Sequence, residues 1–402
     1  MSPSGTLSKT PDSARSQAIG YVMVAMHSVT CIGLSMPSVD VLRYVAYLLP
    51  FIAISAWNYL PQVRTNHSLL DCVAIFVAIS VIAVFFTSSI SPFSVSPYAS
   101  RDFFIILGYL IIFAIGWRPS PRQFDIVLLT SAALLAIKYG ASGRGFTLSL
   151  LKSSSLDENY DDYDSFMGLA LVLYYLRYGR NWRLLLALAI MVFGGKRISL
   201  GAFSLGAVFL AFSLFTLRKN EGAARIVFGI VLVTIGGVAA NFVRIVEFAF
   251  DNVPQLSGYY IEEFMAGRYV LSDSLLRIFE DKNWIEVAFG SGPGASDAIV
   301  VDMNIGISLT HNDWLKILVD YGYVGLAAFL FIYYRIFGAN IWTMALGVMN
   351  AIIMMTDNVL IYIFYQFPII MTYWALIEPN TVVRQSWGAR GKFSPRLQAA
   401  KG

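Results

Sequence analysis

Charge is scarce in this sequence. Only 13% of its 402 residues are Asp, Glu, Lys or Arg, and 57% are hydrophobic, whereas a soluble domain carries about a quarter of charged residues. The apolar residues stand in long runs, and a run of about 20 is enough to cross a bilayer as a helix. This composition excludes an ordinary soluble domain. It predicts an all-α, polytopic transmembrane helix bundle, because a backbone in lipid must satisfy its own hydrogen bonds.

Cysteine and nucleotide-binding motifs are also scarce or absent. The two cysteines, Cys31 and Cys72, fall inside or at the edge of apolar runs, so we expect buried thiols and no disulfide framework. The glycine-rich stretch FGSGPGASD (289–297) lacks the Lys-Ser/Thr of a phosphate-binding loop and predicts a tight turn. The formal charge of +4 does not indicate a nucleic-acid partner, because the position of cations matters more in a membrane protein.

The apolar runs predict about twelve membrane spans. They are 18–36, 41–58, 69–90, 102–117, 122–139, 164–177, 181–195, 198–217, 225–246, 313–333, 337–356 and 359–377. We therefore expect a membrane domain over 18–377 between a tail at 1–17 and a basic tail at 378–402. Lys and Arg gather on the side of both tails, which places the termini in the cytoplasm.

Two long outer loops follow from this topology. The first, about 140–163, leads into the acidic run DENYDDYD (157–164), for which a solvated loop is favoured and cation binding stays open. The second, about 247–312, is too long for a simple connector. Its stretch SDSLLRIFEDKNWIEVAFG predicts one helix capped by Ser272 or Asp273. The side chains expected to share its apolar face are Leu275, Leu276, Phe279 and Trp284.

Polar residues then open the tenth predicted span. Asn312 or Asp313 is the expected N-cap. His311, one of only three histidines, is either an interfacial side chain hydrogen-bonded at a helix start or a catalytic imidazole, since histidine transfers protons near neutral pH. Lys316 and Asp320 are four positions apart and can pair on one helix face. Charges in a membrane segment are costly unless they are paired or functional.

Two arginines are expected on the outer side. Arg197, in FGGKRISLGAF, lies between two predicted spans and is either a snorkelling anchor or a guanidinium fork for phosphate or diphosphate. Arg268 lies in MAGRYVL within the second outer loop. Surface arginines are ordinary, so the Arg268 signal is weak on its own.

The order of these motifs resembles the O-antigen ligase/polymerase superfamily of membrane glycosyltransferases. The motifs are GKR, then GR in a long outer loop, then FGSGPG and HNDWLKILVDYGYVGLAAF, within about residues 190–335. The resemblance implies an inverting, metal-independent enzyme without a cofactor. His311 would be catalytic, and Arg197, Arg268 and Asn312 would bind the diphosphate or substrate. Asp313 departs from the smaller or aromatic residue that the family often has after His-Asn.

The implied reaction is polymerisation of lipid-linked oligosaccharide repeat units into O-antigen, capsule or exopolysaccharide. The donor would be a glycan on undecaprenyl diphosphate, at the periplasmic face of a bacterial inner membrane, and the acceptor a glycan or lipid. One alternative is a ligase that transfers the glycan to lipid A core. Another is a transporter of lipid-linked glycans, although no internal repeat is seen. A chain-length regulator as partner stays open.

Overall fold

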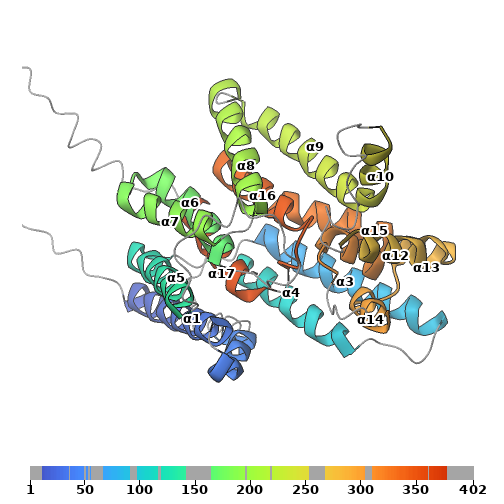
Figure 1. Ribbon diagram of the computed structural model, residues 1–402, viewed down its shortest axis with the longest axis horizontal. Helices are drawn as coiled ribbons and strands as arrows, with labels where there is room; N and C mark the ends of the chain where they lie inside the picture. The colour runs from blue at the N-terminus through green and yellow to red at the C-terminus, as the bar shows by residue number, and fades with distance from the viewer. Residues whose placement is uncertain are drawn as a thin grey trace, which may run out of the picture.

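The computed structural model consists of helices (Figure 1). It describes residues 11–35, 37–48, 51–52, 55, 67–90, 97–115, 119–141, 164–194, 197–217, 220–252, 268–303, 310–360 and 362–377. These ranges contain no strand, so the predicted all-α class is confirmed for them. The acidic run lies outside the described residues except for Asp164, and so do most of both tails.

The elements follow one another along the chain. They are α1 (Pro11–Ser35), the 3₁₀ helix η1 (Pro37–Leu48), α3 (His67–Ile90), α4 (Pro97–Ile115), α5 (Pro121–Ala141), α6 (Asp164–Tyr178), α7 (Asn181–Phe193), α8 (Arg197–Thr216), α9 (Glu221–Ala240), α10 (Phe242–Asn252), α12 (Arg268–Glu280), α13 (Trp284–Phe289), α14 (Ala295–Asp302), α15 (Asp313–Phe337), α16 (Ile341–Ile353) and α17 (Ile363–Ile377).

Among the described residues, five helices are long and apolar enough to cross a membrane by length and composition. They are Leu69–Phe86, Pro121–Gly140, Ile198–Thr216, Glu221–Ala240 and Asp313–Phe337. Shorter apolar helices cover Gln17–Gly33, Asn181–Phe193 and Ile341–Ile353. The predicted number of about twelve spans is therefore not confirmed, because several apolar runs form shorter helices. The run 41–58 contributes to η1 rather than to a long α-helix.

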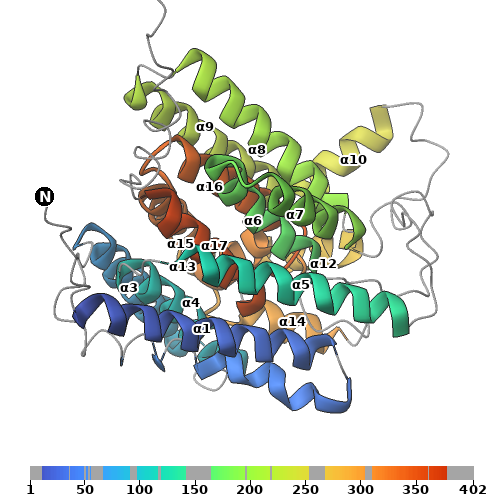
Figure 2. The same cartoon turned by 90° about the vertical axis from the view of Figure 1, so that its left-hand side faces the viewer.

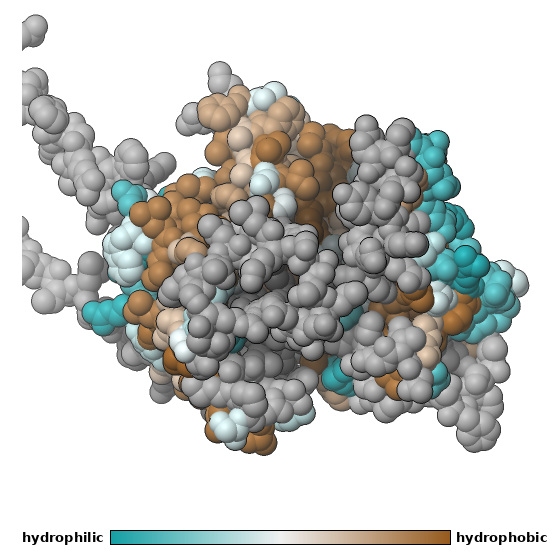
Figure 3. Space-filling model, viewed as in Figure 1, coloured by the Kyte–Doolittle hydropathy of each residue, from teal (hydrophilic) through white to brown (hydrophobic). Residues whose placement is uncertain are grey.

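The surface is divided between an apolar part and a polar end. Helices α1 and α5 lie side by side at one edge (Figure 2), where the Ser28 and Thr130 hydroxyls are 3.4 Å apart. At another end, α10, α12 and α13 gather (Figure 1), and Figure 3 shows hydrophilic surface there and hydrophobic surface over α8 and α9. Large apolar side chains are exposed on α8 and α9: Leu205, Val208, Phe215, Ile226, Ile230 and Val233. An apolar surface of this kind fits contact with lipid.

Helix α15 is broken at Gly322, which has a φ of 68° and a ψ of −172°. The Trp314 and Tyr333 ring centroids are only 5.8 Å apart, whereas 19 residues of straight helix span about 28 Å. Both side chains also bond to α16: the Trp314 indole donates to the Ala351 carbonyl and the Tyr333 hydroxyl to the Gly347 carbonyl, each at 2.9 Å. The expected single span is therefore two segments, 313–321 and 323–337, that meet at a sharp turn.

Glycine is required at this turn because two backbones meet there. A Cβ on Gly322 would lie 2.4 Å from the carbonyl carbon of Ala288. In the backbone segment on the other side of this contact, Gly290 has a φ of 86°, and a Cβ on it would lie 2.2 Å from the Asp320 carbonyl oxygen. No side chain fits either contact. The two glycines therefore let the segment after α13 pack directly on the break in α15.

Within the second outer loop, the described stretch 268–303 forms α12, α13 and α14, where the sequence predicted one helix from Ser272 or Asp273. Ser272 and Asp273 lie inside α12, which begins four residues earlier, so neither is its cap. Leu275, Leu276 and Phe279 are buried as expected, but Trp284 is 75% exposed. The expected helix ends at Glu280, and Asn283 caps a new helix, α13, by accepting from the Ile285 and Glu286 N–H groups. This cap rotates Trp284 off the apolar face.

We predict that Gly322→Ala destabilises the protein strongly. An L-residue in this backbone region costs about 1–3 kcal/mol, and the clash with Ala288 adds to that. Thermal unfolding of the detergent-solubilised protein measures the effect. Gly237→Ala in α9 is the control, since no atom lies within 4 Å of its Cβ. Equal melting temperatures for the two variants would contradict the tight contact at the break.

Candidate functional site

His311 precedes α15 in an unusual backbone conformation. Its φ of 51° is the only positive φ of a non-glycine residue in the described part of the chain, and such outliers gather at functional sites. The His311 side chain keeps 22% exposure, and Nδ1 lies 3.9 Å from the Asp357 Oδ1, whose side chain is 3% exposed. Nδ1 is buried and makes no hydrogen bond. The geometry is that of an imidazole beside a buried carboxylate, at a distance that must shorten before the two bond.

The backbone around His311 is held from three sides. Asn312 is the N-cap of α15, as predicted: its Oδ1 accepts from the Leu315 N–H at 3.0 Å, and its Nδ2 donates to the Ala239 carbonyl at 3.3 Å. The Asp313 N–H donates to the Met354 carbonyl at 2.8 Å. The ends of α9, α15 and α16 therefore meet at His311. Asn312 is 2% exposed, so its amide fixes this junction, and substrate binding by Asn312 stays a prediction.

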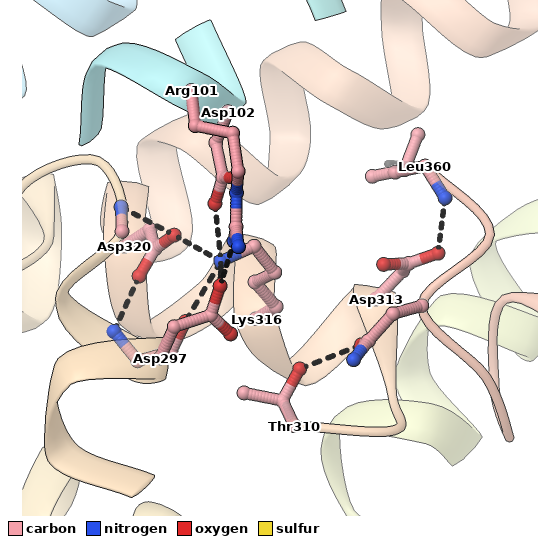
Figure 4. A network of polar contacts seen from close by, with 11 residues as sticks. Arg101, Asp102, Asp297, Thr310, Asp313, Lys316, Asp320 and Leu360 are labelled. Carbon is pink, nitrogen blue, oxygen red and sulfur yellow. Dashed lines mark hydrogen bonds and ion pairs between the residues drawn. The ribbon is translucent and has the colours of Figure 1, made fainter. Parts of the chain in front are cut away.

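Two further bonds close the turn after α16 over the same junction. The Asp313 Oδ2 accepts from the Leu360 N–H at 2.8 Å, and the Thr310 hydroxyl donates to the Asn358 Oδ1 at 2.8 Å (Figure 4). Asp357 lies in this turn. The Asp357 carboxylate is therefore positioned by the bond to Met354 before it in the chain and by the bonds of Asn358 and Leu360 after it.

Helix α8 runs antiparallel to α16. Gly206 on α8 lies directly against Met349, because a Cβ on this glycine would be 2.3 Å from the Met349 Cγ. Farther along α8, the Phe209 ring contacts the Phe228 ring, with centroids 6.1 Å apart, and the Phe228 ring lies beside Gly347. A later residue of α8 thus lies near an earlier residue of α16. The start of α8 is therefore at the end of the pair where α16 ends.

The predicted arginines each begin a helix. Arg197 is the first residue of α8 and Arg268 the first of α12. Nine residues of helix separate Arg197 from Gly206, about 13 Å, which puts the Arg197 backbone level with the turn that contains Asp357. The structure describes neither guanidinium group. It brings the Arg197 backbone to the level of His311, and the convergence of both arginines on His311 stays a prediction.

A cluster of five charged residues, four of them buried, lies beside this junction (Figure 4). The Lys316 Nζ lies 2.7 Å from Asp102, 3.1 Å from Asp297 and 3.2 Å from Asp320. Arg101 completes the cluster, at 2.7 Å from Asp102 and 2.6 Å from Asp297. The three carboxylates are at most 1% exposed and the Lys316 side chain 4%. We call these five residues the ionic cluster.

The ionic cluster joins three parts of the chain. Arg101 and Asp102 come from α4, Asp297 from α14, and Lys316 and Asp320 from the first segment of α15. The predicted pair of Lys316 and Asp320 is confirmed, but the other partners were not foreseen. Arg101, Asp102 and Asp297 each stand beside an apolar run, which is the signal in the sequence that could have indicated them. A single sequence does not tell which charged residues of this kind meet in the fold. Three carboxylates against two cations leave one excess negative charge, and the Asp297 Oδ1 has no hydrogen-bond donor.

The glycine-rich stretch forms the predicted tight turn, and its backbone N–H groups bind the Asp320 carboxylate. The Gly294 and Ser296 N–H groups donate to the two Asp320 carboxylate oxygens at 2.9 and 2.8 Å. Gly290, Gly292 and Gly294 all have positive φ, the conformation that glycine adopts most readily. The turn therefore binds a carboxylate of its own chain rather than a phosphate.

Helix α12 is held to α10 at the polar end of the molecule. The Tyr269 hydroxyl donates to the Glu247 carboxylate at 2.6 Å, and this bond, with a smaller effect of burial, raises the pKa of Tyr269 to about 12. Arg244 pairs with Glu280 between the same two helices. These contacts fix the helix that begins at Arg268.

We predict that Lys316→Met costs about 3–5 kcal/mol of stability, the usual result of leaving buried charges without a partner. Lys282→Met is the matched control, because the Lys282–Glu286 pair is partly exposed and such pairs contribute about 1 kcal/mol or less. The double change Lys316→Met/Asp102→Asn restores the native charge balance of the cluster and should recover part of the loss. Melting temperatures of the three variants measure this, and a mild Lys316→Met would contradict it.

Comparison with known proteins finds no matching family model, curated protein or solved structure. What the residues around His311 do is therefore argued from their geometry, their chemistry and the order of the sequence motifs.

Proposed function

We propose that the protein is a membrane glycosyltransferase that polymerises lipid-linked oligosaccharide repeat units, with His311 as its catalytic residue. The observation that carries the proposal is His311 itself. It has a strained backbone, a partly exposed ring and an unbonded Nδ1 beside the buried Asp357 carboxylate. A surface histidine that only caps a helix needs none of these features. The proposed site faces the periplasm of a bacterial inner membrane.

In the proposed reaction an acceptor hydroxyl attacks the anomeric carbon of a glycan on undecaprenyl diphosphate. The new glycosidic bond forms as the sugar–phosphate bond breaks, with inversion at the anomeric carbon. The imidazole of His311 takes the hydroxyl proton, and the Asp357 carboxylate stabilises the imidazolium that forms. The lipid diphosphate leaves with the bonding electrons. The donor bond supplies the free energy, so the reaction requires neither nucleotide nor metal.

Arg197 and Arg268 are proposed to bind the leaving diphosphate. Both stand at helix N-termini, where backbone N–H groups and the helix dipole favour an anion. A guanidinium placed where negative charge develops lowers the barrier more in a site with little water. The Arg197 backbone lies at the same height along the α8–α16 pair as the turn that contains Asp357, a position compatible with this role.

The acceptor decides between polymerase and ligase. A second repeat unit on its lipid makes the protein a polymerase, and lipid A core makes it a ligase. Transport of lipid-linked glycans is a second candidate, favoured by one observation: α15 is discontinuous and its first segment carries buried charges, as helices at transporter ion sites do. A transporter moves the lipid-linked glycan across the bilayer and forms no new glycosidic bond.

We predict that the protein in liposomes, given the lipid-linked repeat unit and EDTA, forms a ladder of multiples on a gel. His311→Ala should lower the rate by about 10²–10⁴, the contribution of a general base, while the protein still inserts. His67→Ala, at the start of α3, is the matched control. Translocated but unlinked glycan would favour the transporter, and full activity of His311→Ala would remove His311 from the mechanism.

We also predict that Arg268→Ala lowers kcat by about 10²–10³, the loss seen when one group that stabilises a developing anion is removed. Arg277→Ala is the control on the same helix. Arg277 is 70% exposed and pairs with Asp273, so its loss should change kcat less than about twofold. Initial rates at saturating donor measure both. Equal rates for the two variants would show that Arg268 does not contact the diphosphate.

A further inference from the structure

In the core, the Cys31 thiol has two further potential metal-ligand atoms beside it, on elements that do not contribute to the candidate site. The Cys31 Sγ lies 3.6 Å from the His27 Nε2 and 3.7 Å from the Met167 Sδ. His27 and Cys31 are four apart on α1, and Met167 comes from α6. All three are at most 2% exposed. Among the described residues no three His, Cys, Asp or Glu side chains group as metal ligands, so this set depends on the thioether.

The two separations measured from the Cys31 Sγ match those in a three-coordinate metal site. Bonds of about 2.0 Å to nitrogen and about 2.3 Å to sulfur, set 120° apart, separate nitrogen from sulfur by about 3.7 Å and two sulfurs by about 4.0 Å. The observed 3.6 and 3.7 Å need only small adjustment. Met167 also accepts a hydrogen bond from the Ser131 hydroxyl at 3.4 Å, which holds its sulfur in place.

The imidazole of His27 is poorly satisfied without a ligand. The ring is 1% exposed, its Nδ1 makes no hydrogen bond, and its Nε2 contacts only sulfur, a weak hydrogen-bond partner. A buried polar group without a good partner costs about 1–3 kcal/mol. Coordination of a metal by Nε2 would replace the weak contact of this nitrogen with sulfur by a strong bond.

We propose that His27, Cys31 and Met167 form a binding site for a soft monovalent metal ion, Cu(I). Thiolate and thioether ligands select Cu(I) over harder ions. Binding replaces the thiol proton: the S–H bond breaks, a Cu–S bond forms, and the proton leaves to solvent. One thiolate then neutralises one Cu(I), which suits an apolar interior, whereas a divalent ion would leave a buried charge.

The test is Cu(I) binding to the purified full-length chain in detergent, without a polyhistidine tag. Bathocuproine disulfonate competes for the metal, and metal is counted per protein. We expect one retained Cu(I) per wild-type chain and less than a tenth of that in Cys31→Ser. Cys72→Ser removes the other buried cysteine and is the matched control, with occupancy unchanged. Equal occupancy in Cys31→Ser and Cys72→Ser, or none in the wild type, overturns the proposal.

A second measurement reads the ligands directly and does not depend on a disruptive variant. X-ray absorption at the copper edge should report two sulfurs and one nitrogen in the wild type. Met167→Leu conserves side-chain volume and should lose one sulfur and bind Cu(I) about tenfold more weakly. A copper spectrum with only nitrogen and oxygen neighbours, or one that Met167→Leu leaves unchanged, refutes the assigned site.

Discussion

The ammonium group of Lys316 holds together the part of the molecule that carries the candidate site. Three buried carboxylates from α4, α14 and α15 surround it, and none of these charges is stable in an apolar interior without the others. The cluster therefore constrains where α14 and the first segment of α15 can lie. Because His311 immediately precedes that segment, the position of its imidazole depends on the same cation.

The break in α15 explains how a charged cluster and an apolar helix fit in one stretch of sequence. The segment 313–321 is buried throughout, with Lys316 and Asp320 turned toward α4 and α14. After Gly322 the segment 323–337 packs against α3 and α16 and exposes apolar side chains such as Phe331. Non-helical backbone within a membrane is tolerated where protein surrounds it. Here the end of α13 and the turn that follows it pack against the break.

Local features of the sequence predicted local features of the structure. The Asn312 cap, the Lys316–Asp320 pair and the glycine-rich turn each depend on residues close together in the chain. The break at Gly322 was missed because GYVG reads as ordinary apolar helix, and its cause is the Ala288 backbone more than 30 residues away. Likewise, nothing near Asp102 in sequence indicates that it meets Lys316. Trp284 was misplaced because the Asn283 cap starts a new helix.

The separation of the cluster residues along the chain constrains the order of assembly. Arg101 and Asp297 are 196 positions apart, so α4 is synthesised long before its partners. When the segment of Lys316 and Asp320 emerges, its charges make entry into lipid alone unfavourable. It must settle against α4 and the turn before α14, both already in place. Closure of the ionic cluster is therefore a late event in biogenesis, and the junction around His311 forms only once most of the bundle has been inserted.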